Sequence, residues 1–251
     1  MKISARYATC FTLLASLLLL LAGCAKFPGN GAAGANTQVR FSMTVAGKIK
    51  PNYIYVVAIR WAKDNPPFDK DRGPIPVIAA PWGNGMVAGR ANVFMKWDAF
   101  QSPEYQLFEF TDPIPDNQFP VDGQAYLTQF ALKSIPLNVR DVGENDRTIE
   151  FTLDLSQIAQ NSGDIPLLRN LQVNFLTMDR VPQGNDTGSK FWDGIGDNDS
   201  VFDVGNFLTV SLDQNNTYSN TQGQYQGVET QNDVPDPDLD IVDWQIQVTR
   251  P

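Results

Sequence analysis

The chain has 251 residues, with 28 Asp and Glu against 19 Lys and Arg, so its formal net charge is −9 at pH 7. Such an acidic surface repels phosphate backbones, and we therefore expect no nucleic-acid partner. The sequence contains no histidine. This absence excludes Ser-His-Asp and Cys-His catalysis, the usual zinc and copper sites and haem ligation by histidine.

The first 24 residues have the features of an export signal. Lys2 and Arg6 precede an apolar run over residues 11–21, as in a secretory signal peptide. The run is about half as long as a helix that spans a bilayer. It ends in Leu-Ala-Gly-Cys at residues 21–24, which resembles the lipobox of bacterial lipoproteins. The resemblance implies removal of residues 1–23 and a lipid on Cys24.

The resemblance also implies where the protein acts. Acyl chains such as palmitate on Cys24 would hold it in the cell envelope, and two chains suffice for a stable anchor. Ala25 follows the cysteine, which in a diderm bacterium implies the outer membrane. Cys10 leaves with the signal peptide, so the mature chain would have neither a free thiol nor a disulfide. The lipid is then the expected contact with the membrane, because an acidic domain is repelled by anionic headgroups.

Two further segments are predicted from composition. Residues 24–38 are rich in Gly, Ala and Asn and predict a flexible tether. Residues 39–251 predict one domain. Within it, residues 213–235 are dominated by Gln, Asn, Thr, Ser and Gly and predict a mobile polar loop.

Nine segments predict β-strands, because apolar residues alternate with polar ones or form short apolar runs. These segments are residues 39–45, 53–61, 91–97, 108–110, 125–132, 149–155, 171–175, 208–212 and 242–248. Residues 156–160 predict a single helical turn. Residues 64–81 carry five prolines and predict a long loop, a type that is often functional. The pattern favours an all-β fold, an antiparallel β-sandwich or jelly roll with long loops.

An acidic stretch suggests calcium. Residues 191–249 contain 11 acidic residues and no Lys or Arg. Short Asp and Asn spacings with glycines let one loop supply the oxygens that Ca²⁺ needs, although the pattern is not an EF-hand. The first candidate site comprises Asp193, Asp197, Asn198, Asp199 and Asp203. The alternative is a solvated acidic loop.

A second candidate calcium site comprises Asp236, Asp238 and Asp240. In an extended segment these three carboxylates would project to one side, about 7 Å apart, and repel one another unless a cation intervenes. The alternative is again a solvated loop.

Two tryptophans are candidates for ligand binding. Trp82 lies in a turn-forming Pro-Trp-Gly-Asn-Gly sequence, and Trp192 adjoins the first acidic cluster. An exposed ring of this kind could stack on a sugar, whereas the alternative, which the setting favours, is that both rings anchor loops. Trp61, Trp97 and Trp244 are expected in the core.

The sequence therefore predicts a lipid-anchored, non-catalytic binding or structural module whose ligand is a glycan or an envelope protein. One alternative is a carbohydrate-active hydrolase with two paired carboxylates, but Glu109 and Glu150 lie opposite apolar faces and are expected in solvent. Another alternative is a scaffold subunit of a surface assembly. A glycan binder should expose Trp82 or Trp192, a hydrolase should have two facing acids in a cleft, and a scaffold should expose an apolar patch or an unpaired edge strand.

Overall fold

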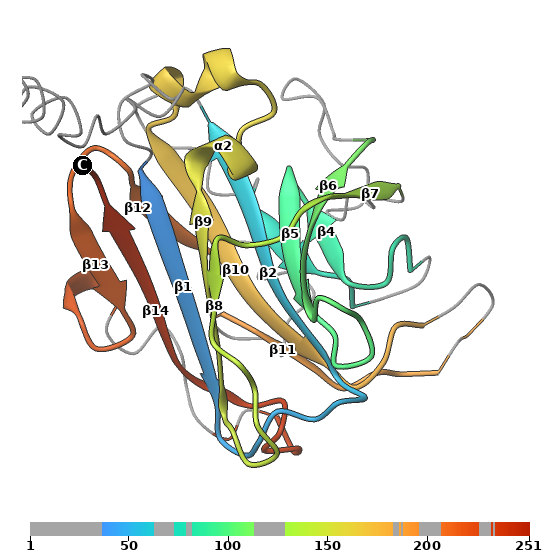
Figure 1. Cartoon of the computed structure of the whole chain (residues 1–251). Helices are drawn as coiled ribbons and strands as arrows, with labels where there is room; N and C mark the ends of the chain where they lie inside the picture. The colour runs from blue at the N-terminus through green and yellow to red at the C-terminus, as the bar shows by residue number, and fades with distance from the viewer. Residues whose placement is uncertain are drawn as a thin grey trace, which may run out of the picture. The chain divides into compact units, whose positions relative to one another are not determined.

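A computed structural model describes most of the predicted domain (Figure 1). The described residues are 37–62, 73–78, 82–112, 129–182, 186, 188–195, 207–225, 232 and 234–251. Cys24, the predicted signal peptide and most of the predicted tether lie outside this set. None of the helices in the described part has the length and apolar character that crossing a membrane requires.

One antiparallel sheet has five strands in the order β13-β14-β1-β9-β8. Its strands are β1 (Gln38–Val45), β8 (Asn138–Val139), β9 (Thr148–Asp154), β13 (Asn216–Ser219) and β14 (Ile241–Thr249). β1 lies between β9 and β14 and pairs with both along its length. Its residues alternate between buried and half-buried, because only one face of the sheet meets the core.

The second antiparallel sheet has seven strands, with the path β11-β10-β2-β5-β6-β7 and β12 paired with β10. Its strands are β2 (Ile54–Ala62), β5 (Val93–Trp97), β6 (Tyr105–Phe110), β7 (Phe130–Ser134), β10 (Asn170–Met178), β11 (Trp192–Gly194) and β12 (Leu208–Ser211). β10 is buried on both faces from Leu171 onward. Such a strand needs apolar residues on both faces, which explains the apolar run at the start of β2, whereas β10 carries the buried polar residues Gln172, Asn174 and Thr177.

The core lies between the two sheets and joins the apolar faces of both. Phe41 stacks on Phe151 within the five-stranded sheet, with ring centroids 5.1 Å apart. Phe175 stacks on Trp244 across the sheets at 6.2 Å. A hairpin of β3 (Pro74–Pro76) and β4 (Val87–Gly89) packs a second apolar cluster onto the outer face of the seven-stranded sheet. The predicted β-sandwich is therefore confirmed.

Helical structure in the described residues is short. It consists of α2 (Leu155–Ile158) and the 3₁₀ turns η2 (Ser162–Leu167) and η3 (Gly223–Tyr225). Asp154 caps α2 by accepting a hydrogen bond from the Ser156 backbone N–H at 2.7 Å. Gln157 closes the capping box by accepting from the Asp154 backbone N–H. The predicted helical turn after β9 is confirmed.

Eight of the nine predicted strands correspond to β1, β2, β5, β6, β9, β10, β12 and β14. Of the ninth, predicted over residues 125–132, residues 125–128 lie outside the described residues and residues 130–132 fall in β7. Five short strands were not predicted, namely β3, β4, β8, β11 and β13. β13 falls inside the segment predicted as a mobile loop, yet it pairs with residues 245–248 of β14. Its residues are polar because it is an edge strand, and Tyr218 fixes it by an edge-to-face contact with Tyr225 at 5.7 Å.

Candidate functional site

Asp193, the first predicted calcium ligand, is fully buried in β11. Its Oδ2 accepts a hydrogen bond from the Ile241 backbone N–H at 2.6 Å, and its Oδ1 accepts from the Gly194 N–H at 2.7 Å. The carboxylate therefore joins the seven-stranded sheet to the start of β14. The other residues of this candidate site, Asp197, Asn198, Asp199 and Asp203, lie outside the described residues.

The second acidic group lies in a turn, so the predicted extended geometry is wrong. The backbone N–H groups of Leu239 and Asp240 both donate to the Asp236 carbonyl. Asp236 accepts from the Tyr53 hydroxyl at 2.6 Å, and Asp240 accepts from the Asn232 backbone N–H at 3.1 Å. In the described part of the chain, no three acidic residues come together as a group that could hold a metal ion.

Asp238 ties the loop between β1 and β2 to this turn. Its Oδ1 accepts from the Lys48 backbone N–H at 2.6 Å, and its Oδ2 lies 2.8 Å from the Lys50 ammonium. This contact raises the pKa of Lys50. Burial pushes the pKa of Asp238 upward, but hydrogen bonds from Lys50 and Lys48 outweigh it, and the pKa falls below its ordinary value. The two loops are thus held together by charge.

The tryptophans mostly serve packing. Trp82 is 8% exposed and packs with Ile75, Val77 and Ala88, while its indole N–H donates to the Asp186 carbonyl. Trp192 is half-buried opposite Met178 in the β10–β11 ladder. These positions match loop and strand anchoring, the alternative predicted for both rings. The remaining three, Trp61, Trp97 and Trp244, pack in or against the main core as predicted.

The two acids weighed for catalysis are ion-paired. Glu109 Oε1 lies 2.7 Å from the Lys133 ammonium, and Glu150 lies 3.7 Å from the Arg40 guanidinium. Glu150 lies on the outer face of β9, as the alternation predicted. For Glu109 the prediction is wrong, because it lies opposite Val93 and shares a face of β6 with Tyr105 and Leu107, which belong to the main core.

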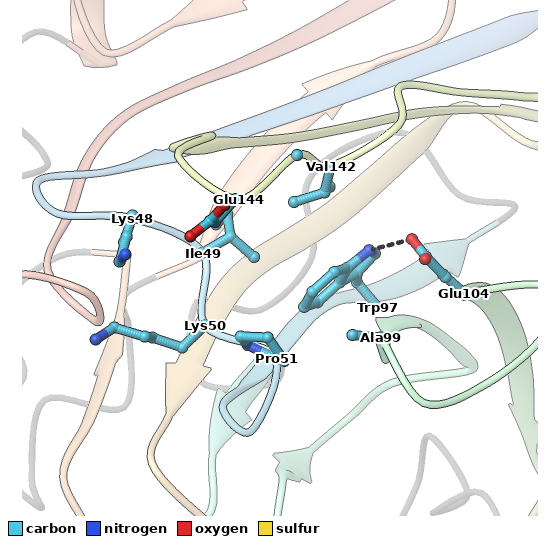
Figure 2. Close-up of a pocket in the computed structure, with 10 residues that line it drawn as sticks. Lys48, Ile49, Lys50, Pro51, Trp97, Ala99, Glu104, Val142 and Glu144 are labelled. Carbon is cyan, nitrogen blue, oxygen red and sulfur yellow. Dashed lines mark hydrogen bonds between the residues drawn. The ribbon is translucent and has the colours of Figure 1, made fainter.

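A pocket of about 370 Å³ lies at one end of the sandwich (Figure 2). It is formed by the β1–β2, β5–β6 and β8–β9 loops. Its apolar surface comes from Ile49, Pro51, Trp97, Ala99 and Val142. Charged residues lie at its margins, namely Lys48, Lys50, Glu104 and Glu144.

The floor of this pocket is fixed by hydrogen bonds and ring contacts. The Trp97 indole N–H donates to Glu104 Oε2 at 3.2 Å, the interaction drawn in Figure 2. Beneath it, Tyr55 meets Trp97 edge to face at 5.9 Å. The Tyr55 hydroxyl accepts from the Lys50 backbone N–H and donates to the Asp238 carbonyl. Burial raises the pKa of Tyr55, so the hydroxyl stays protonated and keeps this donor.

A second surface feature is the segment of residues 130–139, which we call the edge segment. It begins in β7, the last strand of the seven-stranded sheet, and ends in β8, the last strand of the five-stranded sheet. The chain therefore crosses from one sheet to the other on this side of the sandwich (Figure 1). Five large apolar side chains of the edge segment are exposed: Phe130 40%, Leu132 59%, Ile135 52%, Leu137 49% and Val139 45%.

The edge segment is well anchored to the domain. Phe130 packs edge to face on Phe94 and Phe108, with centroids 5.2 and 5.4 Å apart. The Lys133 ammonium is turned inward to Glu109 and the Ala159 carbonyl. Lysines often protect an edge strand by projecting charge into solvent, and Lys133 does not do so here.

Neither surface was predicted as a site. The sequence gives no signal for exposure of the edge segment, because its five large apolar residues alternate with smaller or polar ones, at 130 and 132 and at 135, 137 and 139, as in a half-buried strand. The pocket is assembled from three loops that carry no motif. No family model, curated protein or solved structure matches the chain.

Proposed function

We propose that this chain is a lipid-anchored protein of the cell envelope that acts as a non-catalytic protein-binding module, with the edge segment as its contact surface. The observation that carries the proposal is the exposure of five large apolar side chains beside two sheet edges. Contiguous apolar patches with free strand edges are typical of interaction surfaces.

The other predicted functions have less support. Trp82 is buried and Trp192 is packed into a ladder, so neither offers the open ring that a glycan platform needs. Glu109 and Glu150 are engaged with cations rather than with each other. A protein ligand remains the better match among the predicted classes.

The partner that fits is an extended segment of another envelope protein. Among the described residues, β7 pairs only with β6 and β8 only with β9. An added strand would find backbone hydrogen-bonding groups at these edges and apolar side chains alongside them. A second copy of this chain is disfavoured, because two acidic molecules of like net charge repel each other.

Photo-crosslinking in intact cells tests this proposal. A crosslinking amino acid at Leu137 should yield one discrete adduct, and that adduct should disappear when Leu132 and Ile135 are both changed to Ser. Asn216, which is exposed on β13 at the opposite edge of the five-stranded sheet, is the control position and should not yield it. The same adduct from Asn216, or an adduct that survives the double substitution, would refute the edge segment as the contact surface.

The anchor is tested separately with Cys24→Ser. This variant should lose incorporated palmitate and leave the membrane fraction, because one cysteine carries the acyl chains in this proposal. Retention of the variant in the membrane would contradict the lipid anchor.

A further inference from the structure

The pocket at Trp97 has an apolar centre and unequal ends (Figure 2). Glu104 lies at one end, and the side chains of Lys48 and Lys50 run outward at the other. A volume of about 370 Å³ is enough for a small ligand or a long side chain. The chemistry of the two ends therefore decides which ligand fits.

The basic end is partly neutralised. The Lys50 ammonium is committed to Asp238 at 2.8 Å, and that carboxylate also accepts from the Lys48 backbone. An anionic ligand would have to compete with Asp238 for Lys50. Lys48 alone is a solvated point charge, which recognises an anion weakly.

The acidic end is not neutralised by an ion pair within the described part of the chain. Among the described residues, no Lys or Arg forms an ion pair with Glu104, nor with Glu144, which lies on the side of Ile49 and Lys48 (Figure 2). Glu104 is half-buried, and the Trp97 indole N–H fixes one of its oxygens. Its carboxylate is thus held in place beside the apolar floor and has acceptor capacity left.

We infer that this pocket binds a lysine or arginine side chain of a partner polypeptide, with the hydrocarbon stem along Ile49, Pro51, Ala99 and Val142 and the cationic head at Glu104. Long basic side chains lay their methylene groups on apolar surfaces while the head reaches a polar group. The acidic net charge of the chain adds long-range attraction for a basic partner. The inference stands on the pocket and needs no contact at the edge segment.

The test uses three probes that differ in one end group: the Nα-acetyl N-methylamides of lysine, norleucine and glutamate. The full chain is labelled with ¹⁵N-tryptophan, which gives five indole signals, and each is assigned by substituting one tryptophan at a time. The Trp97 indole signal reports directly on Glu104, because that N–H donates to its carboxylate.

We expect a saturable shift of the Trp97 signal with the lysine probe and binding about fivefold weaker with the norleucine probe, as for a partly exposed ion pair. Glu104→Gln should weaken lysine binding to the norleucine level and leave norleucine binding unchanged. Glu150→Gln is the control, since that acid belongs to the outer face of β9 and pairs with Arg40. Leu132→Ser should have no effect, which separates this site from the edge segment.

Two outcomes overturn the inference. If the glutamate probe bound as tightly as the lysine probe, Lys48 and Lys50 would determine which ligand the pocket binds. No saturable shift with any probe would make the pocket a surface depression without a ligand. Because the three probes are compared on the unchanged chain, the inference is tested even if Glu104→Gln folds poorly.

Discussion

The Lys50 ammonium lies 2.8 Å from the Asp238 carboxylate, and this contact joins the loop after β1 to the turn before β14. The same carboxylate accepts from the Lys48 backbone N–H. One aspartate therefore holds in place the wall of the pocket that contains Lys48, Lys50 and Pro51.

The pH dependence of stability should show this contact. The pKa of Asp238 is lowered in the folded state, so its contribution is present above the unfolded value of about 4 and is lost as the pH falls through the folded value. The pKa of Lys50 is raised, so its contribution is lost only as the pH rises above about 10.5. We expect Asp238→Asn to lower the melting temperature by a constant amount from about pH 5 to pH 9 and by less below pH 4. A difference that does not change with pH would show that packing, not charge, is responsible.

Gly47 packs so closely against this turn that it leaves no room for a side chain. A Cβ at this position would lie 2.1 Å from Asp238 Oδ1 and 2.8 Å from the Pro237 carbonyl carbon. We expect Gly47→Ala to destabilise the domain by about 1–3 kcal/mol, as overpacking does. Gly163→Ala is the matched control, because a Cβ there meets no atom within 4 Å. Equal melting temperatures for the two variants would contradict the close approach.

The capping box of α2 gives a third expectation. Asp154 is 4% exposed and accepts from the Ser156 N–H. Asp154→Ala should cost about 1 kcal/mol, and Asp154→Asn should keep most of the stability because asparagine is an equally good N-cap. Chemical denaturation of both variants measures this. A larger loss for Asn than for Ala would rule out the cap as the cause.

Lys190 should make stability rise with pH. It is 6% exposed, and its ammonium donates to the Gly85 carbonyl at 2.7 Å. Burial lowers its pKa to about 7, against a smaller opposite effect of the Asp179 charge. The unfolded chain then binds more protons than the folded chain between about pH 7 and pH 10, so the free energy of unfolding increases over that range. Lys190→Met should reduce this increase. Thermal melts of both chains at pH 6.5 and pH 9.5 measure it. An equal change in melting temperature for the two chains would exclude Lys190 as the source.

Calcium stays a prediction for Asp197, Asn198, Asp199 and Asp203. If the acidic loop holds Ca²⁺, a hundredfold excess over the dissociation constant should stabilise the folded chain by about 2.7 kcal/mol. A chelator should reverse the rise in melting temperature, and Asp199→Ala should abolish it. No rise with Ca²⁺ would leave the solvated acidic loop as the interpretation.

Much of the fold could be predicted because alternation reports burial directly. In β1 and β9 every second residue faces the core, and the sequence shows it. The short strands could not be predicted in this way. β13 has four residues, of which none but Tyr218 is apolar, and it exists because β14 offers it a partner. Pairing between distant segments leaves no local periodicity to read.

The candidate sites were harder, because spacing of acids along the chain does not determine what they meet in space. The sequence around Asp193 predicts a calcium ligand in an acidic loop, but its carboxylate is buried and accepts from the Ile241 backbone N–H. The spacing of Asp238 predicts one of three carboxylates that repel one another, but Asp238 forms an ion pair with Lys50 from a distant loop. Trp97 belongs to the core, as predicted. Its indole also forms the floor of a pocket, and the walls of that pocket come from loops that contain no recognisable motif.

The central position of β1 has a mechanical consequence. If Cys24 is held by lipid, tension on the domain enters at Gln38, the first residue of β1. β1 is bonded along its length to β14 on one side and to β9 on the other, with hydrogen bonds perpendicular to the strand, so both ladders oppose a pull along β1. Extraction must therefore shear two ladders at once instead of opening one bond at a time. A partner bound at the edge segment could then be pulled away from the membrane under load while the domain stays folded.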